Sequence, residues 1–200
     1  MQDTGYRIQD KKTTNMYYES CILLRGSRGL TLIELLIAIT VIGILAVVLG
    51  FEFRDWIRKY RVESQIKEMY IDLMNTRARA MQQNRMHFVT LANTEYAIYE
   101  DMNPAPDGNE SLETAADALI LRKDINPNYA LSWSNPGDPQ LNFTRAGLSD
   151  LDGTKTVCSN SMLSTDYDCI IVSATRMNLG SLTTKIPDGG ACDDANCIIK

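Results

Sequence analysis

Residues 30–51 constrain this chain most strongly, because they are apolar apart from two threonines and Glu34. This run of 22 residues matches the roughly 20 residues that a helix needs to cross the hydrocarbon core of a bilayer. Two arginines, Arg25 and Arg28, lie just before it. The run therefore predicts a membrane-spanning helix with a basic patch on its N-terminal side.

Glu34 is the one ionisable residue within that run. A charged side chain at the centre of a membrane helix costs about 2.5–3.5 kcal/mol on insertion scales, and the cost falls toward the ends. Because Glu34 lies near the start of the run, its placement alone allows two interpretations. It is either a carboxylate near the lipid headgroups or a functional group that requires a partner.

The sequence around Glu34 carries a family resemblance. Residues 29–34, Gly-Leu-Thr-Leu-Ile-Glu, preceded by the two arginines and followed by the apolar run, resemble the class III signal of type IV pilins and type II secretion pseudopilins. The resemblance implies that prepilin peptidase cleaves after Gly29 and methylates the new N-terminus at Leu30. It also places Glu34 at the fifth mature position, where the family has a glutamate. Leu30 departs from the phenylalanine that family members more often have there.

The resemblance and the composition together predict four segments. Residues 1–29 form a class III leader peptide, whose true start we expect at Met16; residues 30–51 form a transmembrane and assembly helix. Residues 52–85 form an amphipathic helix, and residues 86–200 a β-rich periplasmic domain. A plain N-terminal anchor remains an alternative, because basic residues flank the apolar run on both sides.

We expect the amphipathic helix because residues 52–85 contain neither proline nor glycine. Their apolar side chains recur at nearly helical spacing, which predicts a stripe that packs on a sheet. The stripe consists of Val62, Ile66, Met69, Tyr70, Leu73, Met74 and Met81.

Beyond residue 86, short apolar runs alternate with turn residues, which is typical of an antiparallel β-meander. We expect strands at residues 87–91, 95–99, 118–122, 129–133, 140–143 and 168–173. The predicted fold class is therefore α+β: a long N-terminal helix, with a membrane-spanning half and an amphipathic half, packed on an antiparallel sheet. This is the plan of the pilin fold.

Two later stretches resemble the paired closing strands of GspH/FimT-type minor pilins. In that pattern a strand with the sequence aromatic-x-x-x-Gly precedes an apolar strand that ends in a Gly-Arg pair. Residues 141–147 and 169–177 follow this order, although Thr175-Arg176 stands where Gly-Arg is usual. The implied subclass is a minor pilin.

Four of the five cysteines follow the leader, at Cys158, Cys169, Cys192 and Cys197. An even number of cysteines in a periplasmic domain favours disulfides. Sequence order favours the pairs Cys158–Cys169 and Cys192–Cys197, although four cysteines allow three pairings. Metal binding is disfavoured, because Cys192 and Cys197 lack the compact Cys-x2-Cys spacing of a metal site.

The sequence contains no catalytic constellation. His87 is its only histidine, and neither the Gly-x-Ser-x-Gly elbow nor a phosphate-binding glycine loop occurs. Asp150 and Asp152 resemble part of a calcium loop but lack its remaining ligands, so they are weak calcium candidates. With Asp166 and Asp168 they are better explained as turn formers. We expect no cofactor and no enzymatic activity.

The formal net charge is −5 for the chain and −7 for the residues after Gly29, and this acidic balance argues against a nucleic-acid partner. The sequence predicts a minor pilin or pseudopilin, held in the inner membrane with its C-terminal domain periplasmic and then incorporated into a filament. Its expected partners are prepilin peptidase, other pilins in a helical filament, the inner-membrane assembly platform and, before assembly, membrane lipid. The alternatives are a DNA-binding minor pilin and a signal-anchored periplasmic enzyme.

Overall fold

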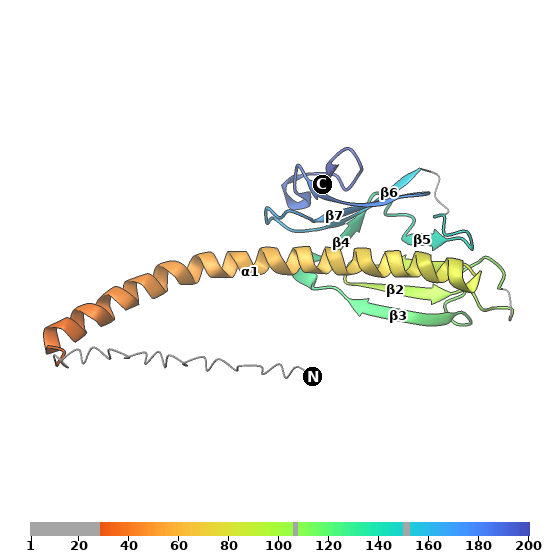
Figure 1. Cartoon of the computed structure of the whole chain (residues 1–200). Helices are drawn as coiled ribbons and strands as arrows, with labels where there is room; N and C mark the ends of the chain where they lie inside the picture. Colours follow the sequence, from red (N-terminus) through yellow and green to blue (C-terminus); the bar gives the residue numbers. More distant parts are fainter. Residues whose placement is uncertain (1–28, 106–107, 150–152) are drawn as a thin grey trace, which may run out of the picture. The chain divides into compact units, whose positions relative to one another are not determined.

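The structure is a computed structural model that describes residues 29–105, 108–149 and 153–200. The chain divides into two compact units, Met1–Leu45 and Ala46–Lys200. The described part of the first unit is helical from Leu32 onward, and the second unit holds the rest of that helix and all the described strands (Figure 1).

The long helix α1 runs from Leu32 to Gln83. From Val62 onward its buried face repeats at intervals of four and three residues, and this face packs against the strands. The buried positions are Val62, Ile66, Met69, Leu73, Thr76 and Ala80.

Two members of the predicted stripe lie elsewhere on α1. Met74 and Met81 are exposed, whereas Thr76 and Ala80 take positions on the buried face that the sequence analysis did not assign to it. The helix ends where Asn84 adopts a left-handed conformation, with φ of 53°. The Arg85 amide then donates to the Ala80 carbonyl at 3.2 Å, which is the hydrogen bond of a Schellman cap.

The strands form two antiparallel sheets rather than one meander. The first sheet has the order β3-β2-β1-β5 and the second the order β4-β6-β7-β8-β9. In Figure 1 the part of α1 inside the domain runs between β2 and β3 on one side and β6 and β7 on the other. The strands are β1 (His87–Leu91), β2 (Glu95–Glu100), β3 (Ala118–Asp124), β4 (Leu131–Trp133), β5 (Gln140–Phe143), β6 (Thr154–Ser159), β7 (Cys169–Ser173), β8 (Met177–Leu182) and β9 (Cys197–Ile199).

Side-chain alternation along the strands builds three apolar clusters. In β7, Ile170 and Val172 join the main cluster with α1, while Cys169 and Ile171 point into a second cluster beneath the C-terminal tail. In β2, Ala97 and its alternating neighbours contribute to a third cluster on the outer face of the first sheet. Each sheet therefore has apolar side chains on both faces, which explains why nearly every residue of β1, β2, β6 and β7 is buried, whereas the edge strands β3 and β9 are largely accessible.

The predicted α+β class, with a long helix on antiparallel sheets, is confirmed. All six predicted strands are present, with bounds that differ by a few residues. Strands β6, β8 and β9 were not predicted. Their sequences are rich in threonine, serine, lysine and glycine or are only three residues long, so they lack the apolar run that marks a strand.

Candidate functional site

The residues of the proposed processing signal lie at the start of the described chain. Residues 29–31 are exposed and precede α1, so the peptide bond between Gly29 and Leu30 is outside any helix. No other described atom lies within 4 Å of a Cβ built on Gly29. Packing in the described structure therefore does not require glycine at this position.

Glu34 lies in the first turn of α1 and is exposed. Its amide donates to the Thr31 carbonyl at 3.1 Å and to Thr31 Oγ1 at 3.3 Å. Thr31 therefore caps the helix, and an acidic side chain in the first turn is favourable for the helix dipole. Within this chain Glu34 has a structural explanation that needs no partner.

The large apolar side chains of residues 32–47 are all exposed, by 48–81%. Among the described residues, no helix combines the length and apolar content that a membrane crossing requires.

The disulfide pairing differs from the one that sequence order favours. Cys158 is bonded to Cys192 and Cys169 to Cys197, with Cα–Cα distances of 5.9 and 6.2 Å. The predicted pairs Cys158–Cys169 and Cys192–Cys197 are wrong. Cys158 and Cys169 lie opposite each other on β6 and β7, but each is bonded to a cysteine of the C-terminal tail.

The Cys169–Cys197 disulfide spans β8 at Gly180. Cys169 is the register partner of Gly180 on one side, and β9 pairs with β8 on the other. A Cβ on Gly180 would lie 2.6 Å from the Ile198 carbonyl oxygen and 2.8 Å from Cys197 Sγ. Glycine at this position therefore allows the tail to approach β7 closely enough for the bond.

The acidic residues near the C-terminus have structural roles where they are described. Asp168 is buried and accepts hydrogen bonds from the Leu182 amide at 2.7 Å and Thr165 Oγ1 at 3.1 Å, and it pairs with Lys185. Asp166 is exposed and pairs with Lys200. The calcium candidates Asp150 and Asp152 lie outside the described residues. In the described ranges, no three His, Cys, Asp or Glu side chains gather as a metal site would require.

His87 is fully buried at the start of β1. Burial lowers its pKa, against the opposing effects of the Arg85 carbonyl and the Glu100 carboxylate. Its Nδ1 lies 3.3 Å from the Arg85 carbonyl oxygen, and its Nε2 has no hydrogen-bond partner among the described residues. A neutral, enclosed imidazole of this kind is a packing residue.

A polar cluster that the sequence analysis missed joins α1 to the first sheet. Asp72 accepts a hydrogen bond from the Tyr96 hydroxyl at 2.6 Å, and Lys123 lies 2.6 Å from both Asp72 and Glu68. Burial and the neighbouring Asp72 carboxylate raise the pKa of Tyr96. The sequence did contain a sign of this cluster. Glu68 and Asp72 are four residues apart, which places two acids on one flank of the apolar stripe.

A buried lysine connects the second sheet to the loop before β5. Lys155 is 3% exposed, and its ammonium donates to the Asp138 carboxylate at 2.7 Å and to the Asp138 carbonyl at 2.9 Å. The hydrogen bond from Lys155 lowers the pKa of Asp138. Because both groups satisfy each other, this ion pair is structural.

The domain has shallow hollows beside the N-terminal part of its helix. One, of about 320 Å³, is lined by Tyr60, Gln65, Glu68, Lys123 and Tyr129 among others. Its lining includes the Glu68–Lys123 ion pair. None of its lining residues is an activated nucleophile. Its residues do not form a catalytic arrangement.

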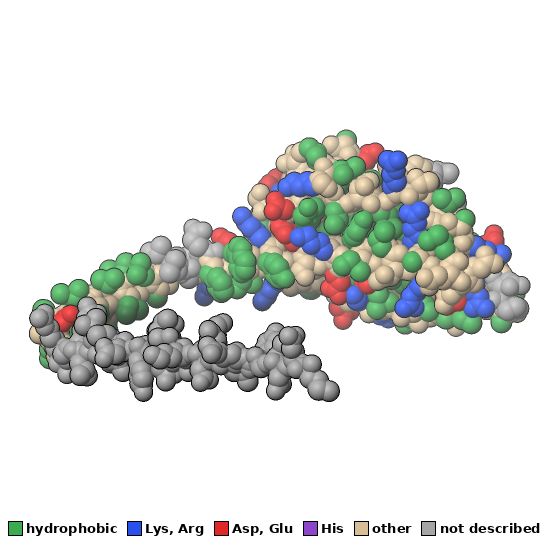
Figure 2. Space-filling view, viewed as in Figure 1, with side chains coloured by type: hydrophobic (Ala, Val, Ile, Leu, Met, Phe, Trp, Pro, Cys, Tyr) green, Lys and Arg blue, Asp and Glu red, His purple; other side chains and the backbone are tan. Residues whose placement is uncertain are grey.

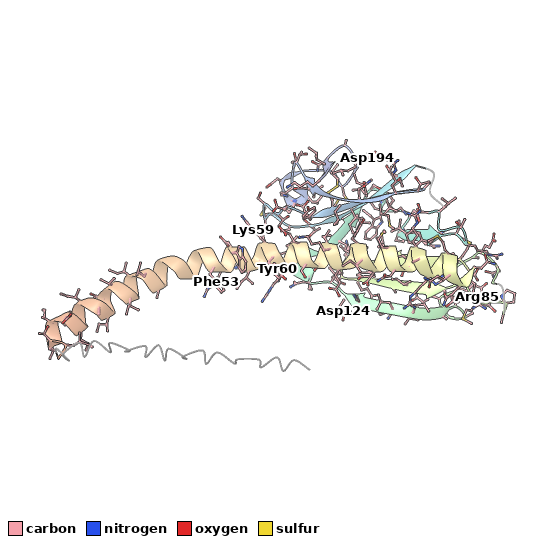
Figure 3. The ribbon with its side chains drawn as sticks, in the orientation of Figure 1. Phe53, Lys59, Tyr60, Arg85, Asp124 and Asp194 are labelled. Atoms are coloured by element: carbon pink, nitrogen blue, oxygen red, sulfur yellow. A yellow bond between two sulfur atoms is a disulfide. The ribbon has the colours of Figure 1, made fainter. Side chains whose placement is uncertain are left out.

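An exposed row of aromatic side chains, which the sequence analysis also missed, lies on α1 ahead of the buried stripe. Phe53, Trp56 and Tyr60 are 58%, 62% and 63% exposed. Their rings stack in sequence, with centroids 6.0 and 6.1 Å apart. Phe53 and Tyr60 are labelled along the helix in Figure 3. We call these three residues the aromatic row.

Comparison with known proteins gives one family match and several structural likenesses. Residues 24–50 match the family model described as the prokaryotic N-terminal methylation motif. No curated protein matches the chain.

Two solved structures resemble the domain at low identity. The type IV minor pilin FimU of Pseudomonas aeruginosa is 17% identical over 62% of this chain and 91% of its own, with a TM-score of 0.47. The minor pseudopilin EPSH from the type II secretion system of Vibrio cholerae is 10% identical over 62% of this chain and 97% of its own, with a TM-score of 0.45.

Proposed function

We propose that this chain is a minor pilin or pseudopilin of the type IV pilin and pseudopilin superfamily, because residues 24–50 match the prokaryotic N-terminal methylation motif. The main observation in support of this proposal is the motif match over residues 24–50, a range that contains Gly29, Leu30 and Glu34. The superfamily consists of structural subunits that assemble with one another, so the chain acts by association rather than by catalysis.

Processing by prepilin peptidase occurs after Gly29 and leaves Leu30 as the methylated N-terminus. The exposed, non-helical conformation of residues 29–31 supports this proposal, because a peptidase binds an extended peptide more readily than a helix. The open space around Gly29 supports it as well, since packing does not account for the glycine.

Residues 30–51 then hold the subunit in the inner membrane, with the domain in the periplasm, until the assembly platform transfers it into a pilus or pseudopilus. The uniformly exposed apolar side chains of residues 32–47 support this step. Such a surface is stable only against lipid or against apolar helices of neighbouring subunits.

Glu34 contributes to assembly by pairing with the N-terminal amine of an adjacent subunit. In a filament core with little water, a carboxylate without a partner is strongly destabilising. Pairing with the amine would therefore set the register between neighbouring helices.

Two substitutions test the proposal, with cleavage and incorporation measured separately. Glu34→Ala should leave cleavage intact but reduce incorporation into filaments, whereas Asp188→Ala, at an exposed carboxylate of the domain, should reduce neither. Gly29→Glu should abolish the mobility shift that accompanies cleavage. Wild-type incorporation of the Glu34 variant would refute the charge pair, and normal cleavage of the Gly29 variant would refute the processing site.

A further inference from the structure

The aromatic row lies where α1 enters the domain, and Trp56 and Tyr60 line shallow hollows together with residues of the domain. Its three rings stack on one another rather than on the strands, and each is more than half exposed. In Figure 2 an apolar patch covers this stretch of the helix surface, just ahead of the bulk of the domain. Single exposed apolar side chains are common on a folded monomer, whereas a cluster of three large aromatic side chains on one helix indicates an interaction surface.

Basic side chains accompany the aromatic row. Arg54, Arg58, Lys59 and Arg61 are all exposed. The ion pair of Arg58 with Asp55, at 3.7 Å, is itself largely exposed and neutralises little of this charge.

The charge of this stretch is opposite to that of the rest of the domain. Residues 52–61 contain four basic and two acidic residues, whereas residues 62–200 contain eleven basic and nineteen acidic ones. A surface that combines aromatic rings with local positive charge, in an otherwise acidic domain, fits an occupant that is both amphipathic and anionic. Aromatic rings are enriched where a bilayer meets water, and arginine and lysine bind anionic headgroups.

We propose that the aromatic row and its four basic neighbours form a collar that binds the anionic phospholipid surface of the membrane. The proposal rests on the membrane anchor of the proposed function, since the collar begins two residues after that segment ends. The rings of Phe53, Trp56 and Tyr60 lie at the level of the headgroups, and the basic side chains bind the phosphates. The collar thereby fixes the height at which the domain stands above the bilayer.

The test uses the full chain in vesicles of phosphatidylcholine and phosphatidylglycerol, with Trp133→Phe so that Trp56 is the only tryptophan. The emission of Trp56 should shift to the blue. Bromine on the acyl carbons nearest the headgroup should quench it about twofold more strongly than bromine near the chain end, as expected for an interfacial ring. In the Trp56→Phe control, which keeps Trp133 in β4, neither bromolipid should quench the emission.

A second arm tests the charges. With Gln at positions 54, 58, 59 and 61, quenching of Trp56 should become the same in phosphatidylcholine vesicles with and without phosphatidylglycerol, whereas the native charges should make it stronger with the anionic lipid. Equal quenching in both lipids with the native charges present would refute the role of the basic residues.

Three other outcomes would refute the proposal that the collar binds lipid, and each points to a different cause. If the chain floats with the vesicles but Trp56 emits as in water and is fully quenched by acrylamide, the aromatic row does not contact lipid. If acrylamide and bromolipids both fail to quench it, a second copy of the chain covers it. If the chain does not float with the vesicles, the membrane anchor itself is refuted together with the collar.

Discussion

In the first half of α1, residues 32–47, every large apolar side chain is exposed, whereas in the second half, residues 62–83, a stripe of apolar side chains is fully buried. Both halves belong to one continuous helix. The second half finds its apolar partner in the strands of its own chain, and the first half has none among the described residues of its unit. One helix can therefore bury its apolar side chains against its own domain at one end and leave them exposed for contact with other molecules at the other end.

The largest expected effect comes from truncating the same residue type in each half. Leu73→Ala, at a position with 0% exposure, should lower the free energy of unfolding of the domain by about 2–5 kcal/mol through a buried cavity. The matched control Leu36→Ala, at a position with 48% exposure, should change it by less than about 0.5 kcal/mol. Chemical denaturation of the full chain in detergent, monitored by domain fluorescence, measures both.

Equal losses for the two leucine variants would contradict the comparison, because they would show that the first half also contributes its apolar side chains to the folded domain.

An intermediate effect is expected from removing the Cys169–Cys197 disulfide by double substitution with serine. A bond between residues 28 apart in sequence stabilises a domain by about 2–4 kcal/mol. Hydrogen exchange should increase in β7 to β9 and in the second half of α1, which shares the main cluster with β7.

Exchange in residues 32–47 should not change in the disulfide variant, and this segment serves as the internal control. Faster exchange in both halves would show that the whole helix depends on the C-terminal sheet.

The smallest expected effect is the pH dependence that His87 confers on the domain. Because its folded pKa lies below the ordinary value, the unfolded chain binds the proton first as pH falls. The contribution of His87 to stability is therefore complete above about pH 6.5 and decreases below it, by up to about 1.4 kcal/mol per pH unit.

Denaturation midpoints between about pH 6.5 and 5, above the range in which most carboxylates titrate, measure this slope. Replacing His87 with Gln should flatten it, even though the substitution lowers stability at every pH. A substitution in the first half of α1, Glu34→Gln, should leave the slope in place. An unchanged slope in the His87 variant would show that protonation of His87 is not the source of the pH dependence.

Residues 29–34, which contain the proposed processing site, show what the structure adds to a sequence motif. The sequence identified residues 29–34 by their pattern alone, and the structure shows that Glu34 and Thr31 also form an ordinary helix N-terminus. The capping role lies within one chain, whereas the proposed assembly role depends on the N-terminal amine of a second molecule.

The sequence by itself determined the features that depend on local pattern. Helix α1 follows from a long stretch free of proline, with helical apolar spacing in its second half, and six strands follow from short apolar runs between turn residues. The motif at residues 24–50 is likewise contiguous and needs no tertiary contact to be found.

Only the tertiary structure decided which distant segments meet. Cys158 bonds to Cys192 rather than to Cys169, its neighbour in sequence order, because the tail covers the face of the second sheet on which these side chains lie. Met74 is exposed while Thr76 is buried, because the orientation of α1 between two sheets decides which residues of a broad apolar face are covered. Such contacts join residues tens of positions apart, and local composition does not encode how those segments are brought together.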